Sequence, residues 1–245
     1  MICLILAAGY ATRLYPLTEN FPKPLLQVGE KTILDWLVDD IAAAGVVDRF
    51  VLISNHKFAA QFEAWSKTKE QKITVIDDGT ETNETRLGAV KDLQLAIERL
   101  SLDDDLFVIA GDNVLDFSLR RLLDYAARKG ASCVMRYYEP DENRLRRTGV
   151  AEPGENDRLL SLEEKPAAPK SHWSVPPFYY YTKADARRIP EAIADGCGTD
   201  APGSLVAWMC RHGTVYAMEM PGKRFDIGTP ESYAAVQRDY DGIRA

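Results

Sequence analysis

The stretch Leu6-Ala7-Ala8-Gly9-Tyr10-Ala11-Thr12-Arg13-Leu14, followed by Phe21-Pro22-Lys23-Pro24-Leu25, is the part of this sequence that decides its fold. The apolar run 2–6 before it predicts a buried strand that stops at the small residues. Small residues let backbone N–H groups come close to a phosphate chain. Arg13 and Lys23 bring two cations to the same loop. The stretch therefore predicts a strand that ends in a site for a triphosphate.

These two segments also carry a resemblance to a known family. The pattern Gly-x-x-Thr-Arg-x-x-Pro, then Pro-Lys-Pro, resembles the signature of nucleotidyltransferases that act on sugar 1-phosphates. The chain is similar to the short members, such as glucose-1-phosphate thymidylyltransferase- and uridylyltransferase-like proteins, since it stops soon after an expected helix at 230–239. The resemblance implies an α/β fold: a Rossmann-like three-layer sandwich with a mixed, mostly parallel sheet, of the GT-A-like type.

The resemblance implies roles for residues in and beyond the loop. Arg13 and Lys23 would be catalytic, because cations stabilise the phosphate that is transferred and the pyrophosphate that leaves. Asn83 falls where relatives place an amide that contacts the base, and an amide that donates and accepts suits a pyrimidine. The nucleotide-binding residues that we expect are Leu6, Ala7, Ala8, Gly9, Asn83, Gly88 and Asp112.

Two aspartates are candidates for a metal site. Asp112 follows an apolar strand in Ala110-Gly111-Asp112-Asn113, and Asp226 stands in Arg224-Phe225-Asp226-Ile227-Gly228. Hard carboxylate oxygens, completed by phosphate oxygens and water, suit Mg²⁺. Both segments resemble the metal-binding aspartate motifs of the family. The alternative is a pair of aspartates that only form turns.

A second block, Leu162-Glu163-Glu164-Lys165-Pro166, resembles the Glu-Lys-Pro segment of the family. The resemblance implies that Glu164 binds hydroxyl groups of the acceptor and that Lys165 binds its phosphate. It also implies that Gly149 lets an acceptor sugar lie against the backbone. The alternative interpretation is a charged strand end beside an ordinary strand glycine.

The sequence departs from the family at Val175-Pro176-Pro177-Phe178-Tyr179. Relatives that use deoxythymidine or uridine nucleotides usually have Val-Thr-Gly or Val-Asn-Gly before the aromatic strand. Two prolines remove backbone donors there, which argues against a standard glucose 1-phosphate pocket. A modified sugar, or a phosphate that is not on a sugar, remains open as the acceptor.

Strand-like and helix-like runs alternate along the chain. The expected strands are 2–6, 49–54, 72–77, 106–110, 132–138, 149–153, 159–163, 175–181 and 215–220, and the expected helices are 33–44, 59–68, 87–100, 119–129, 184–194, 205–211 and 230–239. This alternation favours a mostly parallel sheet covered by helices, with the active site at the carboxyl ends of its strands. We expect one domain, 1–245, with a nucleotide half to about residue 140 and an acceptor half from about 141.

The composition limits the classes of protein. The chain has 245 residues and a net charge of −7, which argues against a general nucleic-acid binder. Runs of about 18 apolar residues, which a membrane helix needs, are absent from the sequence. The four cysteines have no zinc-ligand spacing, and Cys3 and Cys133 are expected in the core. Reduced thiols and the lack of a secretory leader favour the cytoplasm; a homo-oligomer remains open.

The leading hypothesis is a Mg²⁺-dependent enzyme that joins an NTP and a sugar 1-phosphate into an NDP-sugar and pyrophosphate. Its partners would be the NTP and a phosphorylated small-molecule acceptor, with neither nucleic acid nor membrane. One alternative is a cytidylyltransferase for a small phosphate or phosphonate acceptor. Another is a regulatory domain without activity, which loss of the charged site residues would indicate. A glycosyltransferase would use an Asp-x-Asp motif, and the match Asp103-Asp104-Asp105 is expected to be a solvated loop.

Overall fold

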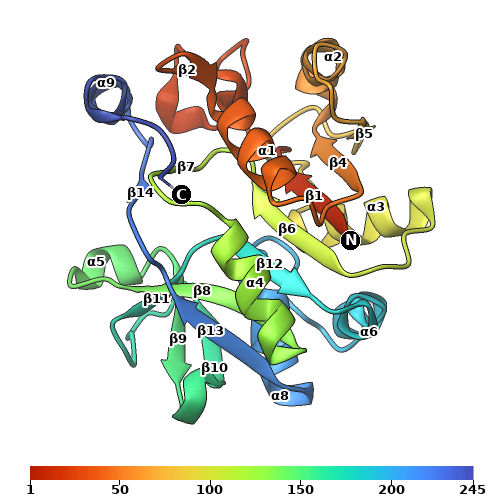
Figure 1. Cartoon of the computed structure of the whole chain (residues 1–245), viewed down its shortest axis with the longest axis vertical. Coiled ribbons are helices and arrows are strands. Elements are labelled where there is room, and N and C mark those ends of the chain that lie inside the picture. Colours follow the sequence, from red (N-terminus) through yellow and green to blue (C-terminus); the bar gives the residue numbers. More distant parts are fainter. Residues whose placement is uncertain (245) are drawn as a thin grey trace. The chain divides into compact units, whose positions relative to one another are not determined.

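The computed structural model describes residues 1–244, which gather into two compact units (Figure 1). The first unit comprises Met1–Arg86, Ala110–Arg120 and the segment from Pro221 onward. The second comprises Leu87–Ile109 and Arg121–Met220. Each unit is thus made from separate stretches of the chain. The prediction of one domain with halves that meet near residue 140 stays a prediction.

The first unit is built on parallel strands. β4 (Arg49–Ser54) pairs in parallel with β1 (Ile2–Leu6) on one side and with β5 (Ile73–Asp77) on the other. β1 and β4 are almost continuously apolar and buried, as expected for strands covered on both faces. The helices that join them are α1 (Ile33–Ala43) and α2 (His56–Ser66).

Short elements complete the first unit. β2 (Gln27–Val28) pairs with β3 (Lys31–Thr32), and β7 (Val114–Leu115) pairs with β14 (Arg224–Phe225), both antiparallel. Helix α9 (Pro230–Asp239) follows, close to β2 in Figure 1. These four strands were not predicted from the sequence, because two residues are too few to form a periodic pattern.

The second unit has a mixed sheet around β8 (Ser132–Tyr138). β8 pairs in parallel with β13 (Val215–Glu219) and antiparallel with β11 (Trp173–Val175) and β12 (Phe178–Tyr181). The other strands are β6 (Leu106–Ala110), β9 (Gly149–Pro153) and β10 (Leu159–Glu164), and the helices are α3 (Ala89–Leu100), α4 (Arg120–Lys129), α5 (Glu142–Leu145), α6 (Lys183–Ala186), α7 (Ile189–Ala194) and α8 (Gly203–His212).

Most expected elements are present within two or three residues, but two are divided. The run 175–181 forms the end of β11 and all of β12, separated by Pro176 and Pro177, which have no N–H to donate to a neighbouring strand. The run 184–194 forms α6 and α7. Pro190 stands in the first turn of α7, where its missing N–H is tolerated, so a new helix begins there.

Helix α1 begins with a capping box. Thr32 Oγ1 accepts a hydrogen bond from Asp35 N at 3.0 Å, and Thr32 N donates to Asp35 Oδ2 at 3.2 Å. These bonds satisfy two groups at the helix end that would otherwise lack partners. They fix the start of a helix whose buried face includes Leu34 and Leu37.

We expect Thr32→Ala to lower the free energy of unfolding by about 1 kcal/mol, because the N–H of Asp35 loses its acceptor. Denaturant unfolding followed by circular dichroism measures this. Thr32→Ser keeps the hydroxyl and should stay within roughly 0.5 kcal/mol of the wild type. Equal losses in both variants would show that the threonine methyl group, and not the cap, stabilises the helix.

Candidate active site

A cavity of about 220 Å³ lies in the first unit, at the carboxyl end of β1. It is lined by Leu6, Ala7, Gly9, Ala11, Arg13, Leu14, Lys23, Pro24, Ala110, Asp112, Ile227 and Gly228. Six of these were predicted from the sequence as nucleotide-binding or catalytic residues: Leu6, Ala7, Gly9, Arg13, Lys23 and Asp112. The fold therefore brings the loop, the two cations and one of the two aspartates to the same place.

The loop after β1 is held by hydrogen bonds to its backbone. Ala7 N donates to Ile53 O at 2.8 Å, and the amide of Asn55, which is fully buried, donates to Ala8 O at 3.0 Å. Ala8 therefore has its carbonyl engaged within the protein and does not line the cavity. Asn55 also caps α2 by accepting from Phe58 N. Asn55 was not among the residues predicted from the sequence, although an asparagine before a helical run is a recognisable cap.

A close backbone approach places Asp112 beside this loop. Gly111 N donates to Leu6 O at 2.9 Å, and a Cβ on Gly111 would lie only 2.9 Å from Ile5 Cγ2. Any other residue at 111 would have to push this contact apart. The glycine before the aspartate is thus required by packing, and it brings the next residue to the mouth of the cavity.

Lys23 and Asp112 form an ion pair inside the site. Lys23 Nζ lies 2.7 Å from Asp112 Oδ2, and Lys23 is only 9% exposed although it is charged. Burial on its own raises the pKa of the Asp112 carboxyl, but the charge and hydrogen bond of Lys23 and the charge of Arg224 outweigh it. The pKa of Asp112 is therefore lowered. The carboxylate is ionised at neutral pH, as a metal ligand must be.

Asp226 reaches the same region through a strand pair. Phe225 pairs with Val114 in the antiparallel β14–β7 ladder, so the segments around Asp226 and Asp112 run side by side. A Cβ on Gly228 would lie 3.7 Å from Asp226 Oδ2 and 3.9 Å from Arg13 Nη1. The second aspartate and the loop arginine are thus both next to Gly228, at the edge of the cavity, and Asp226 itself does not line it.

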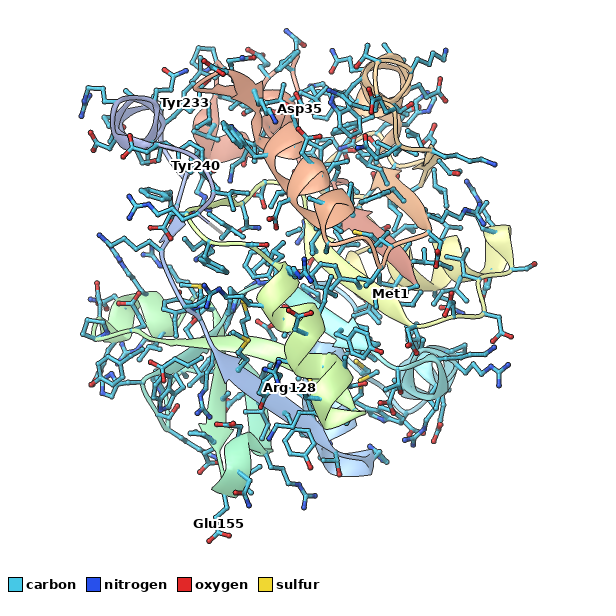
Figure 2. All side chains as sticks on the ribbon, viewed as in Figure 1. Met1, Asp35, Arg128, Glu155, Tyr233 and Tyr240 are labelled. Carbon is cyan, nitrogen blue, oxygen red and sulfur yellow. The ribbon has the colours of Figure 1, made fainter. Side chains whose placement is uncertain are left out.

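Two tyrosines anchor the segment that carries Asp226. The Tyr240 hydroxyl donates to Leu115 O at 2.8 Å, and its ring meets Phe225 edge-on with centroids 5.7 Å apart. The Tyr233 hydroxyl, on α9, donates to Gln27 O at 2.7 Å. Figure 2 shows both side chains beside the α9 segment. They hold β14, and hence Asp226, against the rest of the first unit.

The donor set is compatible with Mg²⁺. Asp112 and Asp226 offer hard carboxylate oxygens, and neither residue is fully buried. Among residues 1–244, no cluster of three or more His, Cys, Asp or Glu side chains could hold a metal by itself. A cation here would therefore need oxygens from another source, such as the phosphates of a bound nucleotide.

The two residues expected to contact the base and ribose, Asn83 and Gly88, belong to different units. Asn83 belongs to the first unit, in the loop before residue 88, where its carbonyl accepts a hydrogen bond from Arg86 Nη1 at 2.6 Å. Gly88 belongs to the second and precedes α3 with φ +93. A Cβ on Gly88 would lie 2.5 Å from Thr199 O and 2.9 Å from Asp200 Cα. Packing within the second unit therefore already requires a glycine at this position.

The expected acceptor residues lie together in the second unit. Glu164 pairs with Gly149 across β10 and β9, and a Cβ on Gly149 would lie 3.2 Å from Glu164 Oε1. A Cβ on Gly203 would overlap the same oxygen. Burial raises the pKa of Glu164, and the charge of Lys165 and a hydrogen bond from Gly203 N offset part of the shift. The carboxylate thus lies between two glycines.

Lys165 follows directly, with φ +49 and its backbone N–H bonded to Thr148 O at 2.9 Å. Its side chain is 56% exposed and its Nζ lies 3.8 Å from Asp200 Oδ2. The roles predicted for Gly149, Glu164 and Lys165 stay predictions, but the three are neighbours. Val175 is the strand partner of Gly149, and Pro176 follows it directly. The carbonyl of Pro176 accepts a hydrogen bond from Phe178 N at 2.8 Å.

Other candidates from the sequence have structural partners. Asp103 pairs with Arg187 and Lys183, and Asp105 accepts from the Tyr180 hydroxyl at 2.7 Å, so the Asp-x-Asp match anchors α6. Cys3 and Cys133 are fully buried, as expected for core residues. No helix within residues 1–244 is long and apolar enough to cross a membrane.

The first unit thus combines a loop of small residues after β1, two cations and one aspartate at a single cavity, with a second aspartate at its edge. The nucleotidyl transferase family model matches residues 2–242, and the chain belongs to this family. This confirms the resemblance seen in the sequence.

Curated relatives include mannose-1-phosphate guanyltransferase of Emericella nidulans, 29% identical, and mannose-1-phosphate guanylyltransferase catalytic subunit beta of Danio rerio, 30% identical. Each match covers 95% of this chain and 62% of the relative, so the chain spans less than two thirds of their length.

Solved structures share the fold. A protein described as a putative glucose-1-phosphate thymidylyltransferase from Bacillus anthracis superposes with a TM-score of 0.80 at 23% identity, over 100% of this chain and 98% of that one. UDP-glucose pyrophosphorylase gives 0.79 at 19% identity, over 98% and 97%. The predicted α/β fold class is thereby confirmed.

We expect Gly88→Ala to displace the Thr199–Asp200 backbone, because the new Cβ would overlap it. Ala89 N and Val90 N donate to Asp200 O and Thr199 O at 3.1 and 3.0 Å, so their amide hydrogens should exchange faster. Hydrogen exchange read by NMR measures this. Gly130→Ala is the control, since Gly130 also has positive φ but no neighbouring atom within 4 Å of the place that a Cβ would take. If Gly88→Ala and Gly130→Ala accelerated the exchange of the Ala89 amide hydrogen equally, the packing argument would be contradicted.

Proposed function

We propose that this chain transfers a nucleotidyl group from an NTP to a sugar 1-phosphate. A phosphate oxygen of the acceptor attacks the α-phosphorus, the bond between this phosphorus and the β-phosphate bridge oxygen breaks, and pyrophosphate leaves. The observation that carries the proposal is the cavity after β1, where Lys23 and Asp112 pair at 2.7 Å beside the Ala7–Gly9 loop. Such transfer depends mainly on positioning and electrostatics, which this site supplies.

Each charged residue has a role in this proposal. The loop from Leu6 to Gly9 holds the phosphates through backbone N–H groups other than that of Ala7, which donates to Ile53 O. Lys23 stabilises the charge that develops at the α-phosphate, and Arg13 binds the pyrophosphate with its planar guanidinium. Asp112 and Asp226 hold Mg²⁺, which when bound neutralises phosphate charge. Family membership supports these roles, and the neighbourhood of Arg13 and Asp226 at Gly228 agrees with them.

The acceptor site in this proposal is the cluster of Gly149, Glu164 and Lys165. Lys165 holds the acceptor phosphate and Glu164 accepts hydrogen bonds from sugar hydroxyls. Both groups belong to a strand end that the β9–β10 pairing fixes. The names of the curated relatives support a sugar 1-phosphate as acceptor and a guanine nucleotide as donor. The amide of Asn83 suits either a guanine or the pyrimidine that the sequence suggested.

A pyrophosphate-release screen tests the activity. GTP, dTTP, UTP, CTP and ATP are each combined with mannose 1-phosphate, glucose 1-phosphate, phosphocholine and a phosphonate. We expect turnover with at least one sugar 1-phosphate, and poor turnover of glucose 1-phosphate because the prolines at 176 and 177 have no backbone N–H to donate. Turnover with phosphocholine or the phosphonate, but with neither sugar 1-phosphate, would reject the assignment of a sugar acceptor. No pyrophosphate from any pair would reject the nucleotidyltransferase activity.

The metal assignment has a separate test. Asp226→Asn removes a hard oxygen ligand, and we expect kcat to fall roughly a hundred-fold at limiting Mg²⁺. A Mg²⁺ titration should show a partial recovery at high concentration. Asp239→Asn makes the same change of charge on the exposed face of α9 and should behave as the wild type. Equal activity of Asp226→Asn and the wild type at every Mg²⁺ concentration would remove Asp226 from the site.

A further inference from the structure

A third charged residue, Asp200, stands beside the acceptor pair Glu164 and Lys165. Its Oδ2 lies 3.8 Å from Lys165 Nζ, and both side chains are about half exposed, at 55% and 56%. Lys165 therefore meets a carboxylate of the protein where an acceptor phosphate would approach it. No sequence motif pointed to Asp200.

The backbone of Asp200 is held firmly. Its carbonyl accepts from Ala89 N and that of Thr199 accepts from Val90 N, so the loop covers the first turn of α3. This approach is possible only because Gly88 has no Cβ, which would lie 2.5 Å from Thr199 O. The position of the Asp200 backbone is thus set by the fold and not by its pairing with Lys165.

The backbone of Lys165 is held as firmly as that of Asp200. Its N–H donates to Thr148 O at 2.9 Å and its φ is +49, a conformation that fixes how the side chain leaves the end of β10. The neighbouring Glu164 is held separately, because its carboxylate accepts from Gly203 N at the start of α8. Two anchored backbones therefore present the ammonium and the Asp200 carboxylate to each other.

The charges of the cluster do not favour a phosphate. Lys165 contributes one positive charge, and Glu164 and Asp200 contribute two negative charges when ionised. An acceptor phosphate that reaches Lys165 must compete with Asp200 for the ammonium and is repelled by the carboxylate. Exposed pairs of this kind are exchanged at low cost, since their net strength is small.

We propose that Asp200 sets the affinity of the acceptor site for phosphate: it occupies Lys165 when the site is empty and gives it up to the acceptor phosphate. This inference rests on the proposed function for the identity of the acceptor. Its consequence is that Asp200 weakens the binding of every phosphate to a similar degree. Discrimination among acceptors then depends on the contacts that the rest of each molecule makes.

The test compares Asp200→Asn with the wild type. Asparagine keeps the size of the side chain and removes its charge, so the KM for the acceptor should fall about two- to five-fold while the KM for the NTP stays unchanged. The difference should shrink as salt is raised, because salt screens exposed charges. Asp200→Glu keeps the charge and should retain the wild-type KM for the acceptor.

The control is Glu155→Gln. Glu155 is exposed in the turn between β9 and β10, at the tip of this hairpin in Figure 2, and β10 separates it from Lys165 along the chain. The variant makes the same change of net charge in the same unit. It should leave the KM for the acceptor unchanged. If Glu155→Gln lowered the KM for the acceptor as much as Asp200→Asn does, net charge alone would govern acceptor binding, and the proposal would be overturned.

A measurement without turnover separates this inference from the proposed function. Inorganic phosphate is titrated into the wild type, Asp200→Asn and Lys165→Gln, and the amide signals of residues 165 and 200 are followed by NMR. We expect tighter binding in Asp200→Asn and loss of the response at residue 165 in Lys165→Gln. Unchanged or weaker phosphate binding in Asp200→Asn would overturn the proposal even if the enzyme turns over sugar 1-phosphates.

Discussion

The ion pair between Lys23 and Asp112 is the interaction on which the candidate active site depends. A lysine that is only 9% exposed must have a partner, because an unpaired ammonium at that depth would be strongly destabilising. Its partner comes from 89 residues further along the chain. The pair therefore joins the proline-framed turn around Lys23 to the Gly111–Asp112 turn, and both residues line the cavity.

Glycines allow other segments that are distant in the sequence to lie in close contact. Gly111 lets its turn lie against β1, Gly88 lets the Thr199–Asp200 backbone cover α3, and Gly149 and Gly203 leave room for the Glu164 carboxylate. At each of these positions a Cβ would stand within 3.2 Å of another atom or overlap it. In proteins of this family, a glycine near the site is easily assigned to ligand contact. Here the packing of the chain accounts for the glycine before any ligand is considered.

The two units differ in the balance of charged side chains at their candidate sites. In the first, Arg13 and Lys23 line a cavity of a chain with net charge −7, and the Asp112 carboxylate pairs with Lys23 there. In the second, Lys165 is flanked by the carboxylates of Glu164 and Asp200. A triphosphate at the first cavity would thus meet two cations and one carboxylate, whereas a monophosphate at Lys165 would meet one cation and two carboxylates.

The sequence by itself determined the longer strands, most of the longer helices and the local motifs, because these depend on apolar runs, glycines and charged residues that are close in the chain. It predicted the loop after β1, the aspartates 112 and 226 and the Glu164–Lys165 pair. It missed Asn55 and Asp200, whose partners are distant in sequence, and it joined 175–181 and 184–194 where prolines divide them. Only the tertiary structure decided which backbones approach each other, since a hydrogen bond or ion pair between remote residues leaves no periodic pattern in the sequence.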